Sequence, residues 1–283
     1  MSTTAFNEEE KAVMWITKRL TESHVFSVLS TVYIFASYCY DNEPVGNFKP
    51  DITRFYVHIL ATALALYGLG LEIYWFPPAK ITDERYTFLK SNVLGYFHFL
   101  TLWIQTICTL HFVFGLIAEF TIHFPEYFGS CWFVHKFCYG VMPFVHSTAV
   151  MLAILFFKFC WFDDEWQNVV VIRLLERGYG NVRKVACFTH IVWVPLAALD
   201  IFYLRNTNAE LIQPLSYQMI WSGFFGIFYM AIMYSFHTWC GLWPYPFLND
   251  MGKIGRLIFF LVIILIFILF SALSSYFIGW LNQ

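Results

Sequence analysis

The chain has 283 residues, of which 59% are apolar, 22% aromatic and only 13% charged. Soluble domains carry about 25% charged residues, so this composition excludes an ordinary soluble enzyme and indicates an integral membrane protein. The net charge of −2 gives no electrostatic support for nucleic-acid binding. The N-terminus, MSTTAFNEEEK, is acidic where a secretory signal would be basic, so we expect no cleaved signal peptide.

In chain order, a first apolar segment at His24–Tyr40 contains scattered Ser, Thr and Tyr residues. Its apolar character is marginal for a membrane span. The segment is compatible with a thin span, a re-entrant segment or an interfacial helix. If it crosses the membrane, most Lys and Arg residues fall on the side of the N-terminus, which favours a cytosolic N-terminus. If it does not cross, the Lys and Arg residues divide evenly and no orientation follows.

Six further stretches are apolar and long enough to cross the hydrocarbon core as helices. They are Phe55–Phe76, Asn92–Phe120, Phe133–Trp161, Val185–Leu204, Leu215–Trp239 and Gly255–Trp280. The expected fold is therefore an all-α polytopic transmembrane helix bundle of six spans, with a possible extra N-terminal span. We divide the chain into an N-terminal region, residues 1–54, and a six-helix domain, residues 55–283.

The seven cysteines lie mostly in apolar runs and form no C-x-x-C pair. We interpret them as small buried apolar residues, not as a disulfide framework or a zinc site. The glycine motifs of dinucleotide and nucleotide binding are also absent from the sequence. We therefore expect no cofactor and no bound metal.

A polar residue inside a membrane span costs free energy, so each one needs a structural or functional explanation. In the second long span His98, Thr101, Gln105 and Cys108 fall on one stripe of a helix. Taken alone, each has an ordinary explanation, because a membrane Thr usually bonds its own backbone and a membrane Gln often joins two helices.

The fourth span carries His190 and, ten residues later, Asp200. The second and fourth spans enter from the same side, so Thr101 and His190 should lie within about 8 Å of the same depth. His237, in the last turn of the antiparallel fifth span, returns to that level. Asp200 should lie about 15 Å deeper than His190, where it would close the pocket floor or pair with a polar group of another span. Pro195 between them should kink the helix.

Three blocks of sequence resemble the androgen-induced and androgen-dependent transmembrane proteins. The block HTWCGLWPYPFLNDMGKIGRLIFF, His237–Phe260, is similar to the family's H-x-x-x-G-M-W-x-Y-P-F-L segment. His190, with a proline at +5 and an acid at +10, resembles the family's H-T-x-x-L-P block. Phe99-Leu100-Thr101 resembles a third, near the start of the second family span. The resemblance covers about Phe55–Gln283.

The resemblance implies an intramembrane threonine hydrolase that cleaves fatty acid esters of hydroxy fatty acids. Thr101 matches the family's nucleophile and His190 its catalytic histidine. A neutral imidazole can take the hydroxyl proton and return it to the leaving alcohol. We expect supporting or substrate-binding roles for Gln105, His98, His237, Asp200, Trp243 and Tyr245. The lipid substrate would enter from the bilayer, in the endoplasmic reticulum or the plasma membrane.

The sequence departs from the family pattern at Cys187, where a histidine is common, and at the extra proline Pro244. The oxyanion donor stays open between Gln105, His237 and a freed backbone amide. One alternative is a non-enzymatic membrane protein, similar to the rolling stone protein linked with cell fusion, in which the polar residues only pack helices. Another is a haem carrier, because His98 and His111 are 13 residues apart on one span.

Overall fold

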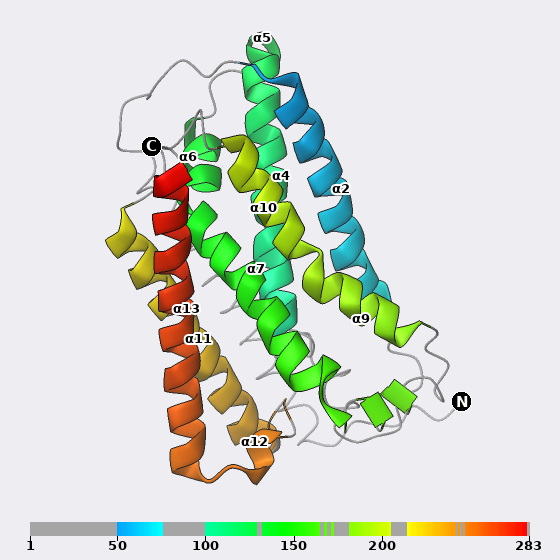
Figure 1. Cartoon of the computed structure of the whole chain (residues 1–283), viewed down its shortest axis with the longest axis vertical. Coiled ribbons are helices and arrows are strands. Elements are labelled where there is room, and N and C mark those ends of the chain that lie inside the picture. The colour runs from blue at the N-terminus through cyan, green and yellow to red at the C-terminus, as the bar shows by residue number, and fades with distance from the viewer. Residues whose placement is uncertain are drawn as a thin grey trace, which may run out of the picture.

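The computed structural model describes residues 50–75, 100–128, 132–164, 167–168, 171–172, 181–204, 214–241, 243, 245 and 247–281. Over these residues the chain contains helices and no strand (Figure 1). Six helical segments are long and apolar enough to cross a membrane, so the prediction of an all-α polytopic bundle is confirmed. The marginal segment His24–Tyr40 lies outside the described residues, as does His98.

The spans agree closely with the apolar stretches of the sequence. The helices are α2 (Ile52–Trp75), α4 (Leu100–His123), α5 (Pro125–Phe128), α6 (Trp132–Gly140), α7 (Met142–Phe156) with the π-helical turn η2 (Phe157–Trp161), α9 (Val182–Ile191), α10 (Trp193–Leu204), α11 (Leu215–Cys240), α12 (Phe247–Asp250) and α13 (Lys253–Leu281).

The third predicted span is divided. The stretch predicted at Phe133–Trp161 forms the short helix α6 and then α7, which begins after Val141. Pro143 lies in the first turn of α7. A proline has no N–H and a fixed φ, so it is tolerated in a first turn but not in a helix interior. The membrane-length segment therefore begins at Met142.

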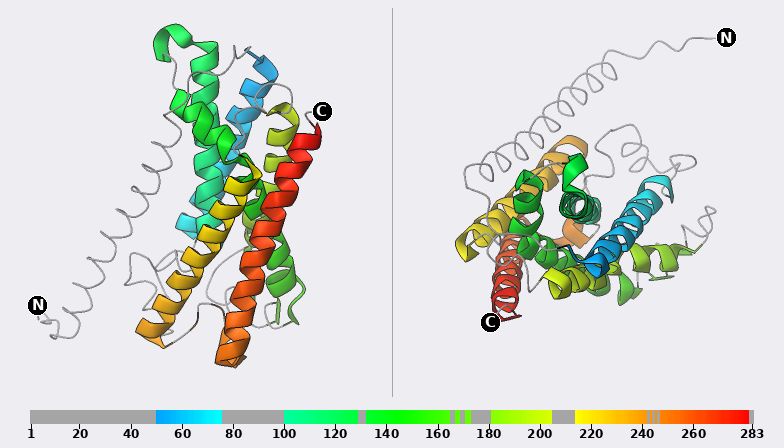
Figure 2. Two further views of the ribbon diagram at one scale, coloured as in Figure 1. Left: turned by 90° about the vertical axis from the view of Figure 1, so that its left-hand side faces the viewer. Right: turned by 90° about the horizontal axis from the view of Figure 1, so that it is seen from above.

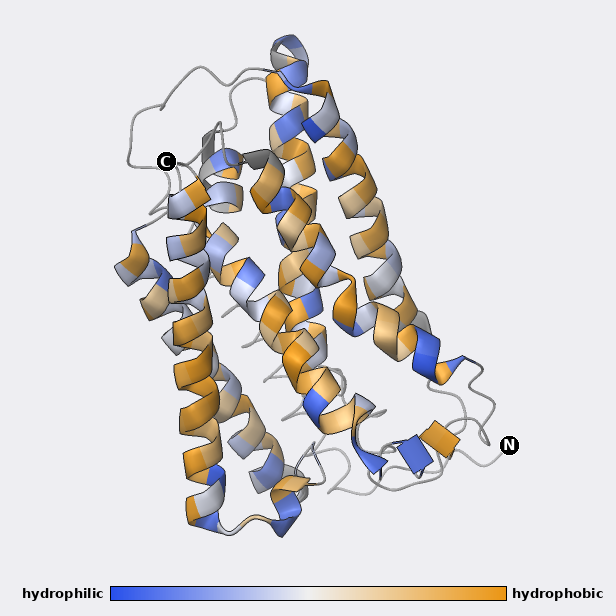
Figure 3. Cartoon of the chain, viewed as in Figure 1, coloured by the Kyte–Doolittle hydropathy of each residue, from blue (hydrophilic) through white to orange (hydrophobic). Residues whose placement is uncertain are grey.

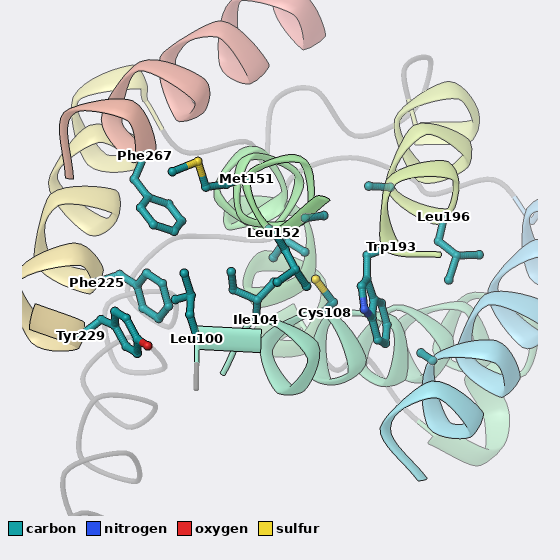
Figure 4. Packing of buried hydrophobic residues seen from close by; sticks show 14 of the residues in the cluster. Leu100, Ile104, Cys108, Met151, Leu152, Trp193, Leu196, Phe225, Tyr229 and Phe267 are labelled. Carbon is teal, nitrogen blue, oxygen red and sulfur yellow. The ribbon is translucent and has the colours of Figure 1, made fainter. Parts of the chain in front are cut away.

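The bundle has two packed helix pairs joined by α7. Helix α2 packs along α4, and α11 packs along α13. Helix α7 contacts both α4 and α13, so it lies between the pairs (Figures 1 and 2). A continuous apolar core follows this arrangement, with Ile104 from α4, Leu152 from α7 and Phe267 from α13 (Figure 4).

The outer face of the bundle is apolar. Helix α13 is hydrophobic along most of its length (Figure 3), and Leu257, Leu261, Leu265, Leu269 and Leu273 form an exposed stripe at four-residue spacing. Such a stripe lies on one side of a helix. An apolar face of this length is costly in water and natural against acyl chains, so we assign it to the lipid.

The fourth span is broken near its middle. Helix α9 ends at Ile191, α10 begins at Trp193, and the two helices meet at an angle (Figure 1). Pro195 lies in the first turn of α10, where its missing N–H is tolerated. The kink that Pro195 predicts is therefore present. It separates the part of the span that carries His190 from the part that carries Asp200.

Candidate functional site

Thr101 and His190 face each other across the interface between α4 and α9. The Thr101 hydroxyl oxygen, Oγ1, lies 3.1 Å from His190 Nε2. Both side chains are half-buried. Thr101 is the second residue of the candidate span Leu100–His123, and His190 lies near the middle of the candidate span Val182–Phe202. A hydroxyl and an imidazole within hydrogen-bond reach are the basic arrangement of nucleophilic catalysis.

The other ring nitrogen determines which tautomer His190 adopts. Nδ1 lies 2.7 Å from the carbonyl oxygen of Ala186, one turn earlier in α9. A carbonyl only accepts, so Nδ1 must carry the proton, and a neutral ring then has its lone pair on Nε2. That lone pair faces Thr101. Phe156 of α7 stacks on the imidazole with ring centroids 4.3 Å apart, which fixes the ring plane.

Gln105 connects the nucleophile's helix to the histidine's helix. It lies one turn after Thr101 on α4 and is fully buried. Its amide nitrogen donates to the carbonyl of Thr189, at 3.0 Å. The indole N–H of Trp193 donates to the same carbonyl at 2.7 Å. Two side-chain donors therefore hold the backbone directly before His190, at the break between α9 and α10.

Tyr245 lies at the N-terminal end of α4. Its hydroxyl accepts a hydrogen bond from the backbone N–H of Leu100, at 3.1 Å, and from the Tyr229 hydroxyl, at 3.3 Å. Desolvation by burial raises the pKa of Tyr245 above its ordinary value. The phenol therefore keeps its proton at neutral pH, and it contacts the amide of Leu100, the residue directly before Thr101.

The remaining candidates lie elsewhere. His237, in the last turn of α11, stacks on Trp243 with ring centroids 4.4 Å apart. The guanidinium of Arg256 lies 5.1 Å from the centre of the Trp243 ring. These three residues form a separate stacked group. Among the described residues we find no contact between this group and Thr101 or His190. Trp243 itself is buried in the apolar core.

Asp200 belongs to a second polar cluster, deeper in the bundle. Its Oδ2 atom lies 2.6 Å from His111 Nε2. His58 and His146 also face this carboxylate, from α2 and α7. Asp200 thus pairs with polar groups of other spans, one of the two positions expected for it. His111, a ligand in the haem alternative, is engaged with this carboxylate.

Sequence reasoning missed several members of the deeper cluster. His58 and the buried ion pair Arg54–Glu119 were not singled out, although all three lie inside predicted or observed spans. The signal was available, because an ionisable residue within a membrane span is a candidate for function by itself. The sequence blocks that resemble the family instead carry Thr101 and His190, which lie apart from this cluster.

The fold and this paired arrangement define a class, namely an all-helical integral membrane protein with six candidate spans among the described residues and a hydroxyl–imidazole pair between two of them. The sequence matches the family model described as FAR-17a/AIG1-like protein over residues 23–278. Because this match covers most of the chain, the protein belongs to the FAR-17a/AIG1-like family, which is the androgen-induced gene 1 family. Comparison with curated proteins gave no match, and comparison with solved structures gave none either.

Proposed function

We propose that the protein is an intramembrane ester hydrolase in which Thr101 is the nucleophile and His190 the general base. The observation that carries this proposal is the 3.1 Å contact between Thr101 Oγ1 and His190 Nε2. The contact of Nδ1 with the Ala186 carbonyl leaves the proton-accepting nitrogen directed at the hydroxyl. A packing role would need only a hydrogen bond, whereas catalysis also needs this tautomer.

The reaction has two halves. His190 Nε2 takes the Thr101 proton while Oγ1 attacks the ester carbonyl, and a tetrahedral intermediate forms. The imidazolium then gives its proton to the leaving alcohol oxygen as the C–O bond breaks, which leaves an acyl-threonine. In the second half Nε2 takes a proton from water, and the resulting hydroxide attacks the acyl carbon. The bond between that carbon and Thr101 Oγ1 then breaks, the imidazolium returns its proton to Oγ1, and the fatty acid leaves.

Tyr245 is the best-placed donor for the oxyanion of this intermediate. Its raised pKa keeps the phenol protonated, and its hydroxyl contacts the first amide of α4, one residue before the nucleophile. A protonated phenol held in an enclosed site stabilises developing negative charge. Gln105, another candidate from the sequence, instead uses its amide nitrogen on the Thr189 carbonyl, so we assign it a positioning role.

The proposed substrate class is supported by the family resemblance and by the position of the site. The half-buried pair lies within two candidate membrane spans, where an ester with two acyl arms would reach it from the bilayer. The family resemblance indicates fatty acid esters of hydroxy fatty acids, which would release a fatty acid and a hydroxy fatty acid. No cofactor is needed for this chemistry. The endoplasmic reticulum or the plasma membrane would hold such a substrate.

The test compares two threonines on the same helix. Thr101→Val keeps the shape of the side chain and removes the hydroxyl, and we expect it to abolish labelling by a fluorophosphonate probe and hydrolysis of a synthetic ester of a hydroxy fatty acid in proteoliposomes. Thr106→Val is the matched control, because the Thr106 hydroxyl bonds its own helix at the Leu102 carbonyl, at 2.7 Å. The control should keep both activities. Wild-type turnover by Thr101→Val would refute the proposal and favour a helix-packing role.

A further inference from the structure

Three histidines surround one carboxylate in the middle of the bundle. His58 of α2, His111 of α4 and His146 of α7 all face Asp200 of α10. Each of the four side chains is at most 3% exposed. The cluster thus takes one side chain from each of four helices, and a set of three neutral donors and one anion is typical of metal sites.

We propose that His111, His146 and Asp200 bind a divalent transition-metal ion of the zinc class, with His58 as a fourth ligand or as a partner of the second carboxylate oxygen. The donor atoms of the first three residues lie within 4.8 Å of one another. This inference goes beyond the proposed hydrolase and does not depend on it. It also departs from the expectation, drawn from the cysteines and the missing motifs, that the chain binds no metal.

Two of the separations between donor atoms match a shared ion better than they match hydrogen bonds. His58 Nε2 lies 3.4 Å from Asp200 Oδ1, and His146 Nε2 lies 3.6 Å from Asp200 Oδ2. Good hydrogen bonds between nitrogen and oxygen are about 2.7–3.2 Å long. Ligands held about 2.0–2.1 Å from a tetrahedral zinc ion lie about 3.3 Å from each other.

Some polar atoms of the cluster also lack a hydrogen bond in the described structure. They are both ring nitrogens of His146, Nε2 of His58 and Oδ1 of Asp200, all buried. A buried polar atom without a hydrogen bond is destabilising, so four such atoms in one cluster need an explanation. A cation between them would satisfy three of the four, since a lone pair on each could coordinate it.

The outer partners of the histidines fit ligation through Nε2. His58 Nδ1 lies 3.1 Å from the Arg54 carbonyl, so it carries the proton and leaves the lone pair on Nε2. His111 Nδ1 lies 3.8 Å from Cys138 Sγ. Metal-binding histidines commonly donate their second nitrogen to such an acceptor. The 2.6 Å contact of His111 Nε2 with Asp200 needs a proton on Nε2. Ion binding would displace that proton, and the neutral ring would then carry its single proton on Nδ1, on the side of Cys138.

The charge balance points the same way. Asp200 is buried, and a buried carboxylate needs a cation nearby. The neighbouring Arg54 is paired with Glu119, and both are fully buried. A protonated histidine of the cluster or a bound ion would supply the positive charge that Asp200 needs. Only the ion also explains the ligand-like spacing of His146, and this difference is what the experiment addresses.

The ion would be structural with respect to the ester chemistry. His111 follows Thr101 by ten residues and Asp200 follows His190 by ten, which at 1.5 Å per residue places the cluster about 15 Å from the Thr101–His190 pair. An ion at that distance cannot contact the ester. It would join α2, α4, α7 and α10, and so fix the helices that carry the nucleophile and the base.

The experiment measures metal directly on the full-length protein, purified in detergent. We expect elemental analysis to find about one zinc ion per chain. After chelation, Co²⁺ should produce the visible absorption of a tetrahedral site. Asp200→Asn and His146→Gln should each lower zinc content at least tenfold. His123→Gln is the matched control, because His123 is only partly buried at the end of α4 and does not contact Asp200.

A second measurement uses the wild-type protein, because a variant that fails to fold would also lose zinc. The wild-type protein, stripped by a chelator, should lose thermal stability and regain it when Zn²⁺ is added. A wild-type chain that carries no transition metal, takes up neither Zn²⁺ nor Co²⁺ and has the same melting temperature with and without chelator would overturn the proposal. Unchanged zinc content in folded Asp200→Asn would also overturn it. Both results would leave Asp200 paired with a protonated histidine.

Discussion

Thr101 Oγ1 lies 3.1 Å from His190 Nε2, although 89 residues separate the two in the sequence. The same separation of 89 residues recurs in the pair His111 and Asp200, ten residues further along both segments. Helix α4 and the α9–α10 span therefore run in the same direction with one register over about 15 Å. A slip of one helix against the other would break both contacts together, so the deeper cluster stabilises the geometry of the outer pair.

His190→Gln tests the role of His190 as the general base while a polar side chain still fills its position. Glutamine keeps a polar side chain of similar length but cannot accept and return a proton at neutral pH. We expect ester hydrolysis to fall by about 10³-fold or more, since triad-type residues act as a unit. The double variant Thr101→Val/His190→Gln should be no worse than either single variant. Additive losses in the double variant would contradict a shared step.

The sequence predicted the fold well because six apolar stretches of membrane length leave few alternatives. It did not predict where α7 begins, because hydropathy does not register that Pro143 starts a helix. For the site, the family blocks indicated Thr101 and His190, and helix rise placed them at one depth. The rest depends on three-dimensional packing. No periodicity reveals that Gln105 reaches the Thr189 carbonyl or that three histidines from three helices meet Asp200.

Gln105→Leu tests the positioning of the histidine. Leucine fills a similar volume but cannot donate to the Thr189 carbonyl, which keeps only the Trp193 indole as a side-chain donor. A small shift of the His190 backbone should follow. Because a misplacement of about 1 Å can cost 10²-fold in rate, we expect kcat to fall by 10- to 100-fold while KM stays within twofold.

Gln105→Met gives the matched comparison, because methionine keeps the unbranched side chain and has no donor for the carbonyl. It should be impaired to the same extent as Gln105→Leu. If Gln105 served only to pack α4 against α9, the variants would lower the melting temperature and leave kcat of the folded fraction unchanged.

Tyr245→Phe tests the proposed oxyanion donor. The change removes one hydroxyl and keeps the ring, which packs against the apolar core. Loss of one oxyanion donor costs about 10²- to 10³-fold in kcat, and the substrate should still bind with an unchanged KM. Tyr229→Phe is the control, since the Tyr229 hydroxyl contacts Tyr245 at 3.3 Å. A milder effect at Tyr229 than at Tyr245 is expected, and equal effects would argue against a specific role for Tyr245.

Gly115→Ala tests the packing around the histidine cluster. A Cβ at Gly115 would lie 2.8 Å from Cδ2 and 3.0 Å from Nε2 of His58, and 3.3 Å from Cys138 Sγ. The His58 ring would have to move away from Asp200. We expect a loss of about 1–3 kcal/mol in stability from overpacking, measured by thermal unfolding in detergent, together with lower zinc content.

The control for this change is Gly70→Ala. Gly70 lies on α2, and a Cβ there meets no atom within 4 Å. Alanine is favoured over glycine in a helix by about 1 kcal/mol, so this variant should be neutral or slightly more stable. If Gly115→Ala behaved like Gly70→Ala in both stability and metal content, the close packing of Gly115 against His58 would contribute to neither property.

Gly226→Ala tests the contact between α11 and α13. A Cβ at Gly226 would lie 2.7 Å from Cγ1 of Ile264 and 3.4 Å from its Cα, so both the side chain and the backbone of α13 oppose it. Small residues allow membrane helices to approach closely, where packing drives association. We expect alanine to separate the helices and lower the melting temperature.

Gly223→Ala is the control for this change. A Cβ at Gly223, one turn earlier, meets only the flexible end of Ile268 at 3.4 Å, so this variant should be tolerated. Because neither glycine contacts Thr101 or His190, the ester hydrolysis rate of the folded Gly226→Ala protein should equal that of the wild type, which separates bundle stability from chemistry.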